Sequence, residues 1–417
     1  MAAQPQVPPH HGVQINGQSS ICILLTDDVF LYEAALKGDW ESVRETFLPH
    51  KKAKFDSPVN TFCRTALHVA AGAGHSEFVI KIVEHMSKEG LERQDKKNGN
   101  TALHFASLNA GIEAVKAMVE FTENKLTQIR NKKGLTPLLL CAAYITNDRK
   151  DVLQYLCSKT IEDGDGGNLM PIFSGNHGAQ LVCNITSAGL YDVAIDLVTN
   201  HPKLATARDT KKCSLLDVLA RKSSDFRSGS QLGFWQRRIY SMIPSQVRVD
   251  ENHQQNSNIT GAVTKFLSWS FWIRAPGIKD VYLKKSANDL TLRLLECICY
   301  NIPKNEKATF FGNSSILRNG AKFGIVELVT KCIQTYPDQI WLVGTAQSIF
   351  HTAVKYRKGK IFSIMYGTSR KKRLMACWRV ESGNNILHLA AKLPPPDVLN
   401  VVAGAALQMQ RELQWFR

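Results

Sequence analysis

The chain has 417 residues, a net charge of +16 at neutral pH and a pI near 9.4. Hydrophobic residues make up 44% of it, which is enough for a sizeable core and excludes wholesale disorder. The basic balance favours acidic partners, namely anionic lipid surfaces, nucleic acid or acidic patches on proteins.

The first residues predict a disordered leader followed by a pair of helices. Residues 1–20 carry Pro, Gln, His and Gly with little periodicity. Helical patterning begins near Leu31, pauses at the turn residue Gly38 and resumes at Trp40. This pair lacks the motif that follows, as the outermost unit of a repeat array often does.

A motif then recurs at a nearly constant spacing. The sequence TALHVAAGAGH begins at Thr65, and shortened copies begin at Thr101 and Thr136, at spacings of 36 and 35 residues. Each copy predicts a helix capped by its Thr and a tight turn, supplied by Gly74 in the first copy, before a second helix. Asn-Gly and Lys-Gly pairs between the copies predict turns with positive φ. Motif and period resemble those of ankyrin repeats, which implies an all-α solenoid that binds proteins.

Histidine occupies one position in four copies, as His68, His104, His351 and His388. A catalytic or metal-binding role is one interpretation, but no carboxylate or cysteine stands beside them at ligand spacing. The resemblance to ankyrin repeats implies instead that each histidine hydrogen-bonds within its own turn. We therefore predict no catalytic, metal-binding or cofactor-binding residue and no cofactor.

Later copies of the motif are degenerate. The Gly- and Asp-rich stretch 163–174 resembles a calcium-binding loop, but its twelfth position is Ser174, and we expect an extended inter-repeat loop. Two further copies are expected near Leu181 and Asp209. In the second of these, Asp217 stands where the histidine usually stands, and we interpret it as divergence at the edge of the array.

Periodicity fails between residues 221 and 280, where nine Lys and Arg accompany four Asp and Glu. Basic residues interleaved with aromatic ones occur at membrane interfaces and on surfaces that stack nucleic acid bases. We favour a linker whose aromatic side chains pack on the adjacent arrays, with membrane contact as the second interpretation. These aromatic residues are Phe234, Trp235, Trp269, Phe271 and Trp272.

The motif returns near Ile316, Ser348 and Gly383. Residues 355–379 contain nine Lys and Arg and no acidic residue. This run predicts either an anionic-surface or nuclear-import patch, or a solvated face between repeats. The candidate patch consists of Arg370, Lys371, Lys372 and Arg373.

We therefore expect an ankyrin-repeat solenoid in two arrays joined by an irregular linker. The expected boundaries are a leader at 1–20, a first array at 21–222, a basic aromatic linker at 223–285, and a second array with a terminal helix at 286–417.

The sequence of the second array resembles one particular family of ankyrin-repeat proteins. The stretches GNNILHLAAKLPPP at 383–396 and GAALQMQRELQWF at 404–416, with the joint at 220–235, resemble a plant family of ankyrin-repeat proteins. Longer members of that family end in a PGG membrane domain. The sequence stops at Arg417, before the place of that domain, so membrane anchoring is not carried over. The resemblance implies a role in plant defence or stress signalling near the plasma membrane.

The remaining patterns concern the compartment. The ten cysteines are scattered without a C-x-x-C pair, which is typical of buried thiols in a reducing compartment. The N-terminus lacks a signal-peptide pattern, and no uncharged run of about 18 residues is apolar enough to span a bilayer. We expect a cytoplasmic protein, which the family resemblance places at the cytoplasmic face of the plasma membrane.

The expected function is that of a non-catalytic protein-interaction scaffold, because none of the common nucleotide-binding, hydrolase, metalloprotease or kinase motifs occurs. The alternative is a basic adaptor that binds membrane surfaces or works in the nucleus, acting through 221–280 and 355–379. The expected partners are proteins and, second, an anionic membrane surface; nucleic acid is disfavoured, and no small-molecule substrate is evident. The candidate partner-binding residues at the repeat tips are Lys96, Asn98, Asn131, Lys132 and Lys133.

Overall fold

A computed structural model describes most of the chain, in these ranges: 26–47, 55–123, 125–163, 172–230, 232–243, 277–312, 315–340, 348–367, 379, 383–401 and 404–415. Throughout these ranges the protein is helical, and its β-structure is one isolated antiparallel bridge between Arg208 and Ser214. The predicted leader, the loop at 164–171 and the basic patch at 370–373 lie outside the described residues.

The chain divides into two compact units. The N-terminal unit comprises Met1–Leu140 and Tyr155–Asp163, and the C-terminal unit comprises Cys141–Gln154 and Gly164–Arg417.

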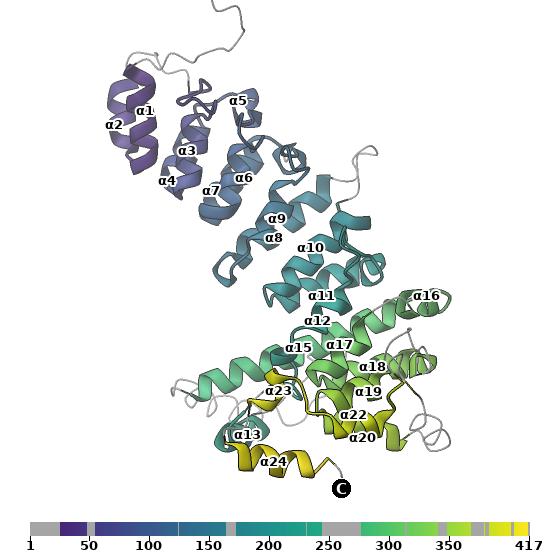
Figure 1. Ribbon diagram of the computed structural model, residues 1–417. Coiled ribbons are helices and arrows are strands. Elements are labelled where there is room, and N and C mark those ends of the chain that lie inside the picture. Colours follow the sequence, from purple (N-terminus) through teal and green to yellow (C-terminus); the bar gives the residue numbers. More distant parts are fainter. Residues whose placement is uncertain are drawn as a thin grey trace, which may run out of the picture. The chain divides into compact units, whose positions relative to one another are not determined.

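The N-terminal unit is built from short helices in pairs (Figure 1). α3 packs between α1 and α6, while α4 packs against α7, so the helices of successive pairs lie side by side. The bounds are α1 (Thr26–Lys37), α2 (Trp40–Phe47), α3 (Ala66–Ala73), α4 (Ser76–Val83), α5 (Lys88–Glu92), α6 (Ala102–Asn109), α7 (Ile112–Phe121), the 3₁₀ helix η1 (Lys125–Gln128), α8 (Pro137–Ala143), and α9 (Lys150–Asp163), of which the first residues belong to the other unit.

The sequence dictates where these helices begin and end. Thr65 and Thr101 are extended residues that directly precede α3 and α6, as predicted for N-caps. Gly74 ends α3 in the left-handed conformation, with φ of 87°, and its N–H donates to Ala70. Gly99 and Gly134 also have positive φ, which confirms the predicted turns between the repeats.

The core of the N-terminal unit lies between the helix layers. Leu67 and Leu103 are wholly buried on the α3 and α6 side, and Phe78 and Met118 are buried between α4 and α7. Small residues such as Ala70 are fully buried as well, so adjacent helices approach closely.

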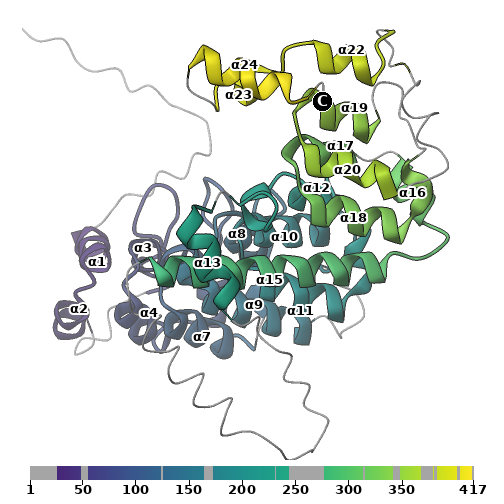
Figure 2. The same ribbon diagram turned by 90° about the horizontal axis from the view of Figure 1, so that it is seen from below.

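In the first part of the C-terminal unit, α10 (Gly175–Ser187) packs against α11 (Tyr191–Asn200) and α12 (Leu215–Leu219). α15 (Ile278–Asn301) then lies alongside α11, with α18 (Val326–Thr335) against it as well (Figure 2). α12 also contacts α17 (Ile316–Phe323), so within this unit the later helices continue directly from the earlier ones.

The predicted linker is partly helical. Residues 234–242 form α13 (Phe234–Met242), which packs against α15, and residues 244–276 lie outside the described part. Tyr240 and Ile243 bury their side chains with Val281 in a small apolar cluster. Lys285 is buried beside them and donates to the carbonyls of Tyr240 and Ile243 at 3.2 and 2.5 Å.

The last helices continue the paired arrangement. α17 and α18 pack together, α19 (Ile349–Lys355) packs on α17, α20 (Gly359–Gly367) and α22 (Ile386–Ala391), and Phe350 lies at the centre of their shared core. The remaining described helices are α16 (Lys307–Gly312), α23 (Pro396–Leu399) and α24 (Ala405–Leu413), together with short 3₁₀ turns. Among the helices that the structure describes, none is long and apolar enough to cross a membrane.

Candidate protein-binding surface

Two repeats of the N-terminal unit, those of α3 and α6, begin with a hydrogen-bonded pair of threonine and histidine. The Thr65 N–H donates to His68 Nδ1 at 3.2 Å, and the Thr65 hydroxyl lies 2.8 Å from the same nitrogen. Because Nδ1 accepts the backbone proton, the ring proton is on Nε2, which donates to the Arg93 carbonyl at 3.1 Å. His104 repeats this pattern with Thr101 and Leu135.

These histidines are neutral structural links. Burial lowers the pKa of both His68 and His104 to about 4, because the charged ring would lose its hydration. A second ring proton would also face the two Thr donors at Nδ1. Each ring thus ties the start of its own helix to the segment that enters the next turn, as expected for these positions.

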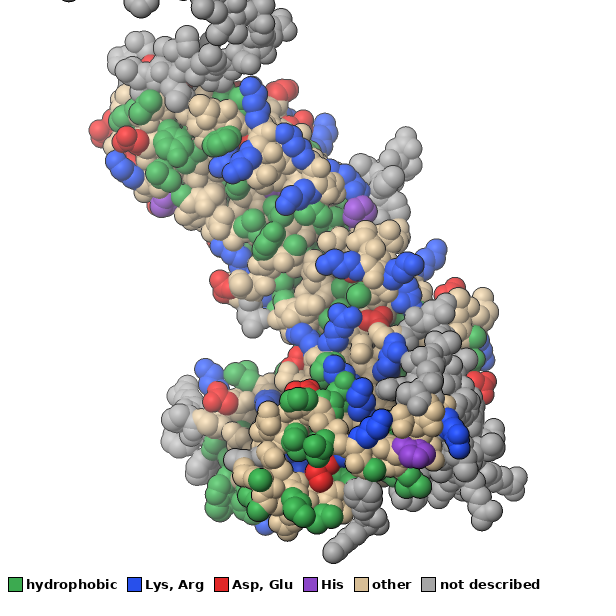
Figure 3. Space-filling view, viewed as in Figure 1, with side chains coloured by type: hydrophobic (Ala, Val, Ile, Leu, Met, Phe, Trp, Pro, Cys, Tyr) green, Lys and Arg blue, Asp and Glu red, His purple; other side chains and the backbone are tan. Residues whose placement is uncertain are grey.

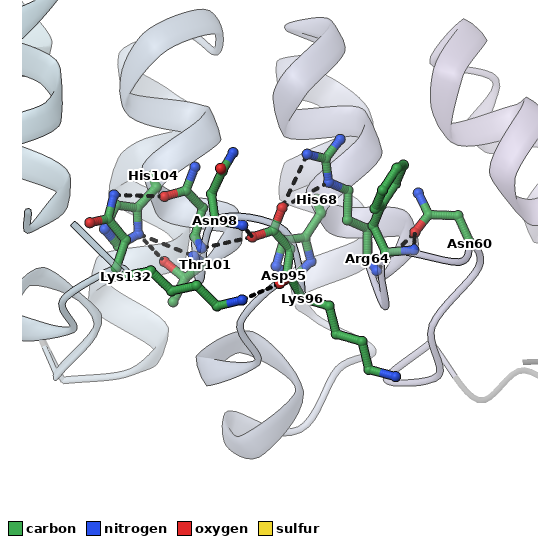
Figure 4. A network of polar contacts seen from close by, with 12 residues as sticks. Asn60, Arg64, His68, Asp95, Lys96, Asn98, Thr101, His104 and Lys132 are labelled. Carbon is green, nitrogen blue, oxygen red and sulfur yellow. Dashed lines mark hydrogen bonds and ion pairs between the residues drawn. The ribbon is translucent and has the colours of Figure 1, made fainter. Parts of the chain in front are cut away.

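The tips between repeats form a continuous backbone ladder (Figure 4). The Lys96 N–H donates to the Phe62 carbonyl at 2.8 Å, and the Lys132 N–H donates to the Asn98 carbonyl at 2.9 Å. Asn131 joins the ladder through its side chain, which donates to Asn100 at 2.9 Å. Adjacent tips are therefore held together by hydrogen bonds and present a continuous edge.

Asp95 lies at the centre of this network (Figure 4). One of its carboxylate oxygens accepts from the N–H groups of Asn98 and Asn100 at 3.0 and 2.9 Å, and the other accepts from Arg64 at 3.1 and 3.2 Å. Burial by itself would raise the pKa of Asp95, but the backbone donors and Arg64 outweigh it and hold the pKa below its usual value. The acidic charge at this tip is thus internally neutralised.

Arg64 also organises a group of aromatic and basic side chains that we call the tip cluster: Phe62, Arg64, Lys97 and Phe105. The Arg64 guanidinium lies 4.7 Å from the Phe105 ring centroid and 5.7 Å from that of Phe62, and the Lys97 ammonium lies 5.6 Å from the Phe62 ring. Phe62 is 45% exposed and Phe105 is half-buried. The cluster therefore offers apolar ring faces next to positive charge.

Exposed cations surround the tip cluster. Figure 3 shows Lys and Arg side chains gathered over the part of the N-terminal unit where α5 and α6 lie. The exposed cations of the two tips are Arg93, Lys96, Lys97, Lys132 and Lys133. Since Asp95 is paired with Arg64, this edge carries a net positive charge.

The five tip residues predicted from the sequence separate into two groups. Lys96, Lys132 and Lys133 are exposed, although the Lys132 ammonium donates to the Lys96 carbonyl. Asn131 is buried, and its side-chain oxygen accepts from the N–H groups of Lys133 and Leu135. Asn98 is half-buried, and its backbone carbonyl accepts the hydrogen bond from the Lys132 N–H. The predicted patch at 370–373 lies outside the described residues.

Comparison with protein families supports the geometry of the N-terminal unit. The family model for ankyrin repeats, in three copies, matches residues 31–125 and 81–166. Residues 31–166 are ankyrin repeats. Ankyrin repeats are protein-interaction modules, so this part of the chain is a scaffold that binds proteins.

One curated protein resembles the chain over part of its length. It is the human transient receptor potential cation channel subfamily A member 1, which is 31% identical over 154 residues. The match covers 36% of this chain and 13% of the channel, so it spans a small part of that protein.

Beyond the matched residues, the cap of the ankyrin repeats recurs in the C-terminal unit. The Ser348 hydroxyl lies 2.6 Å from His351 Nδ1, and the Asn385 N–H donates to His388 Nδ1 at 3.2 Å. His351 is buried, whereas His388 is exposed. The four histidines therefore share one structural position in the described helices.

Asp217 has a more specific role than the divergence proposed from the sequence. It is buried, and its carboxylate accepts from the Ser214 N–H at 3.0 Å and from the Ser214 hydroxyl at 2.7 Å. These are the contacts that Nδ1 of the repeat histidine accepts elsewhere. Its other oxygen accepts from the Ser315 hydroxyl at 3.2 Å, which connects α12 to the start of α17. An Asp thus replaces His as the cap and also links two helices.

The aromatic side chains of the linker require a correction. They were expected to pack on the arrays, but Phe234 and Trp235 are 68% and 75% exposed and contact each other edge to face. They occupy the first turn of α13, whose buried face is formed by Tyr240. Trp269, Phe271 and Trp272 lie outside the described residues.

Sequence reasoning did not single out Phe62, Arg64 and Phe105. Phe62 and Arg64 precede the motif, and Phe105 replaces a Val of the first copy, so they look like ordinary variation. Only the packing of two repeats brings them together.

Other groups in the described part of the chain have no evident chemistry. No group of three or more His, Cys, Asp or Glu there could hold a metal ion. Burial raises the pKa of the thiols of Cys141 and Cys183 to about 12, so these cysteines stay protonated and behave as small apolar residues.

Proposed function

We propose that the N-terminal unit binds an acidic protein segment along its tips, with the tip cluster as the anchor. The observation that carries this proposal is the placement of Phe62 and Phe105 under Arg64, beside exposed lysines and an internally neutralised Asp95. Exposed aromatic rings and arginine dominate the binding energy of many protein interfaces, while surrounding charges select the partner and speed association.

The proposed role is non-catalytic. The resemblance to the plant family supports a role in defence or stress signalling near the plasma membrane, and the ankyrin repeats support the scaffold on which such a role would rest.

The test is capture of protein partners from a plant extract by the full chain, followed by titration of each purified partner. Lys97→Glu with Lys133→Glu should weaken binding by about tenfold or more at low salt, and the difference should shrink as ionic strength rises. Phe62→Ala should weaken binding by about 1–2 kcal/mol at any salt concentration.

The matched control for the charge variant is Lys116→Glu with Lys125→Glu, which makes the same charge change at exposed positions of α7 and η1. Equal effects of the two charge variants would contradict a tip-specific surface.

A second candidate function is contact between the C-terminal unit and an anionic membrane surface. Phe234 and Trp235 favour it, because two large exposed aromatic side chains in a basic segment suit the membrane interface. Sedimentation of the chain with phosphatidylserine vesicles, but not with neutral vesicles, is the expected result. Absence of binding to both at low salt would exclude this function.

A further inference from the structure

A cavity of about 580 Å³ lies within the C-terminal unit and brings together the two basic segments of the sequence. The turn from Arg357 to Ile361, between α19 and α20, contributes one wall. Another wall comes from residues before and within α13, namely Ser228, Gly229, Ser230, Leu232, Gly233 and Arg237. Both segments belong to the regions 221–280 and 355–379, for which binding to an anionic surface is the alternative interpretation of the sequence. The cavity size is typical of sites for small ligands.

The charged residues that line the cavity are all basic: Arg237, Arg357, Lys358 and Lys360. Arg357 has a structural role, because it is buried and forms an ion pair with Glu412 at 2.6 Å. It also donates to the carbonyls of Ala390 and Lys392 at 3.2 and 2.7 Å. The other three cations are available for a ligand.

None of those three cations forms an ion pair in the described part of the chain. The ammonium groups of Lys358 and Lys360 make no hydrogen bond or ion pair there, and the Arg237 guanidinium uses its Nε alone, on the Leu232 carbonyl at 3.0 Å. Lys358 is half-buried, with its stem against Gly324. Burial and the charge of Arg411 lower the pKa of Lys358, and the charge of Asp397 opposes them only in part. Arg237 and Lys360 are exposed, so one half-buried and two exposed cations without ion pairs line the cavity, an arrangement that favours a polyanion.

The segment that lines one wall of the cavity also carries the two exposed aromatic residues. Gly233 and Arg237 line the cavity, and Phe234 and Trp235 stand between them in the sequence at the start of α13. A soluble polyanion has no apolar part that could cover such exposed aromatic side chains. A lipid head group is attached to acyl chains, and aromatic side chains bury readily in the boundary between head groups and acyl chains.

We propose that this cavity binds a phosphorylated head group of a membrane lipid, with Arg237, Lys358 and Lys360 on the phosphates and Phe234 and Trp235 in the interface. The proposal deepens the second candidate function by naming its ligand. It does not depend on the protein-binding role, since all of its residues belong to the C-terminal unit.

The test compares vesicles of equal surface charge that contain either phosphatidylinositol 4,5-bisphosphate or phosphatidylserine. The full chain should bind the bisphosphate vesicles at least about tenfold more tightly. The triple variant R237Q/K358Q/K360Q should abolish this preference, because it removes the three cations that the proposal places on the phosphates. The matched control K279Q/K304Q/R318Q removes the same charge from exposed residues of this unit outside the cavity and should keep it. F234A/W235A should weaken binding to both kinds of vesicle while sparing binding of soluble inositol 1,4,5-trisphosphate.

Three outcomes would overturn the proposal: equal binding to the two kinds of vesicle, equal losses in the triple variant and its control, or binding of the soluble trisphosphate without vesicle binding. Equal binding to the vesicles would leave the second candidate function standing, whereas no vesicle binding would remove both. If the triple variant melts early by circular dichroism, K358Q/K360Q replaces it, because neither ammonium makes a hydrogen bond or ion pair within the described structure.

Discussion

Buried histidines make the ankyrin repeats sensitive to acid. His68 and His104 have a pKa of about 4 in the folded protein, against about 6.5 in an unfolded chain. Between these values the unfolded chain binds protons that the folded chain does not, so the free energy of unfolding falls as the pH falls from 6.5 to 4. The loss is on the order of 3 kcal/mol per histidine at most. Asp95, with its lowered pKa, loses its contribution only at lower pH.

Hydrogen exchange of the α3, α6 and α7 amides, corrected for its intrinsic pH dependence, measures this effect. Protection should decrease between pH 7 and pH 5, and His104→Asn should reduce the decrease by roughly half, because it removes one of the two titrating groups while keeping an acceptor at the cap. The same protection at both pH values would show that these rings are not held neutral.

At the level of helices and turns, the left-handed end of α3 is constrained by the backbone of the next repeat. A Cβ at Gly74 would lie 2.9 Å from the carbonyl oxygen of Asn109, in the next repeat, whereas a Cβ at Gly134 would meet nothing within 4 Å. Both glycines have positive φ, so both substitutions by Ala carry the left-handed penalty of about 1 kcal/mol.

Gly74→Ala should therefore destabilise the N-terminal unit by more than Gly134→Ala, which serves as the control for the conformational penalty. The expected difference is about 1–3 kcal/mol, because the clash is with backbone that can move only if α6 shifts. Hydrogen exchange of α3 and α4 reports the loss for each variant. If the two variants cost the same, the contact between the repeats is looser than described.

For the protein as a whole, the two candidate surfaces belong to separate compact units and should act independently. Lys97→Glu with Lys133→Glu should reduce capture of the protein partner and leave binding to bisphosphate vesicles within about twofold. R237Q/K358Q/K360Q should weaken binding to bisphosphate vesicles and leave capture of the protein partner within about twofold. The variant that combines all five substitutions should lose each kind of binding to the same extent as the variant that affects it alone. Either variant affecting both measurements would indicate coupling between the units.

The repeating motif predicted most of the fold because each of its residues interacts with residues close to it in the sequence. Thr65 and Thr101 cap helices, Gly74 turns the chain, and the histidines bond to the residue three before them, so short-range spacing is sufficient to recognise them. The bond of Asp217 to Ser214 follows the same local spacing. Its bond to Ser315, at the start of α17, depends on the tertiary structure, so the sequence alone could not separate Asp217 from drift.

The sequence by itself determined the helical repeats, the turns between them and the positive charge of the chain, since these depend on residue type and on neighbours within one repeat. Only the tertiary structure decided which charges and rings meet. Arg64 reaches Asp95 and Phe105 across a repeat, and Arg237 meets Lys358 across more than a hundred residues. It also decided that Phe234 and Trp235 face solvent, because α13 can bury one side and Tyr240 lies on it. The exposure of a side chain and its contacts with distant residues depend on packing between segments, and no local sequence pattern encodes them.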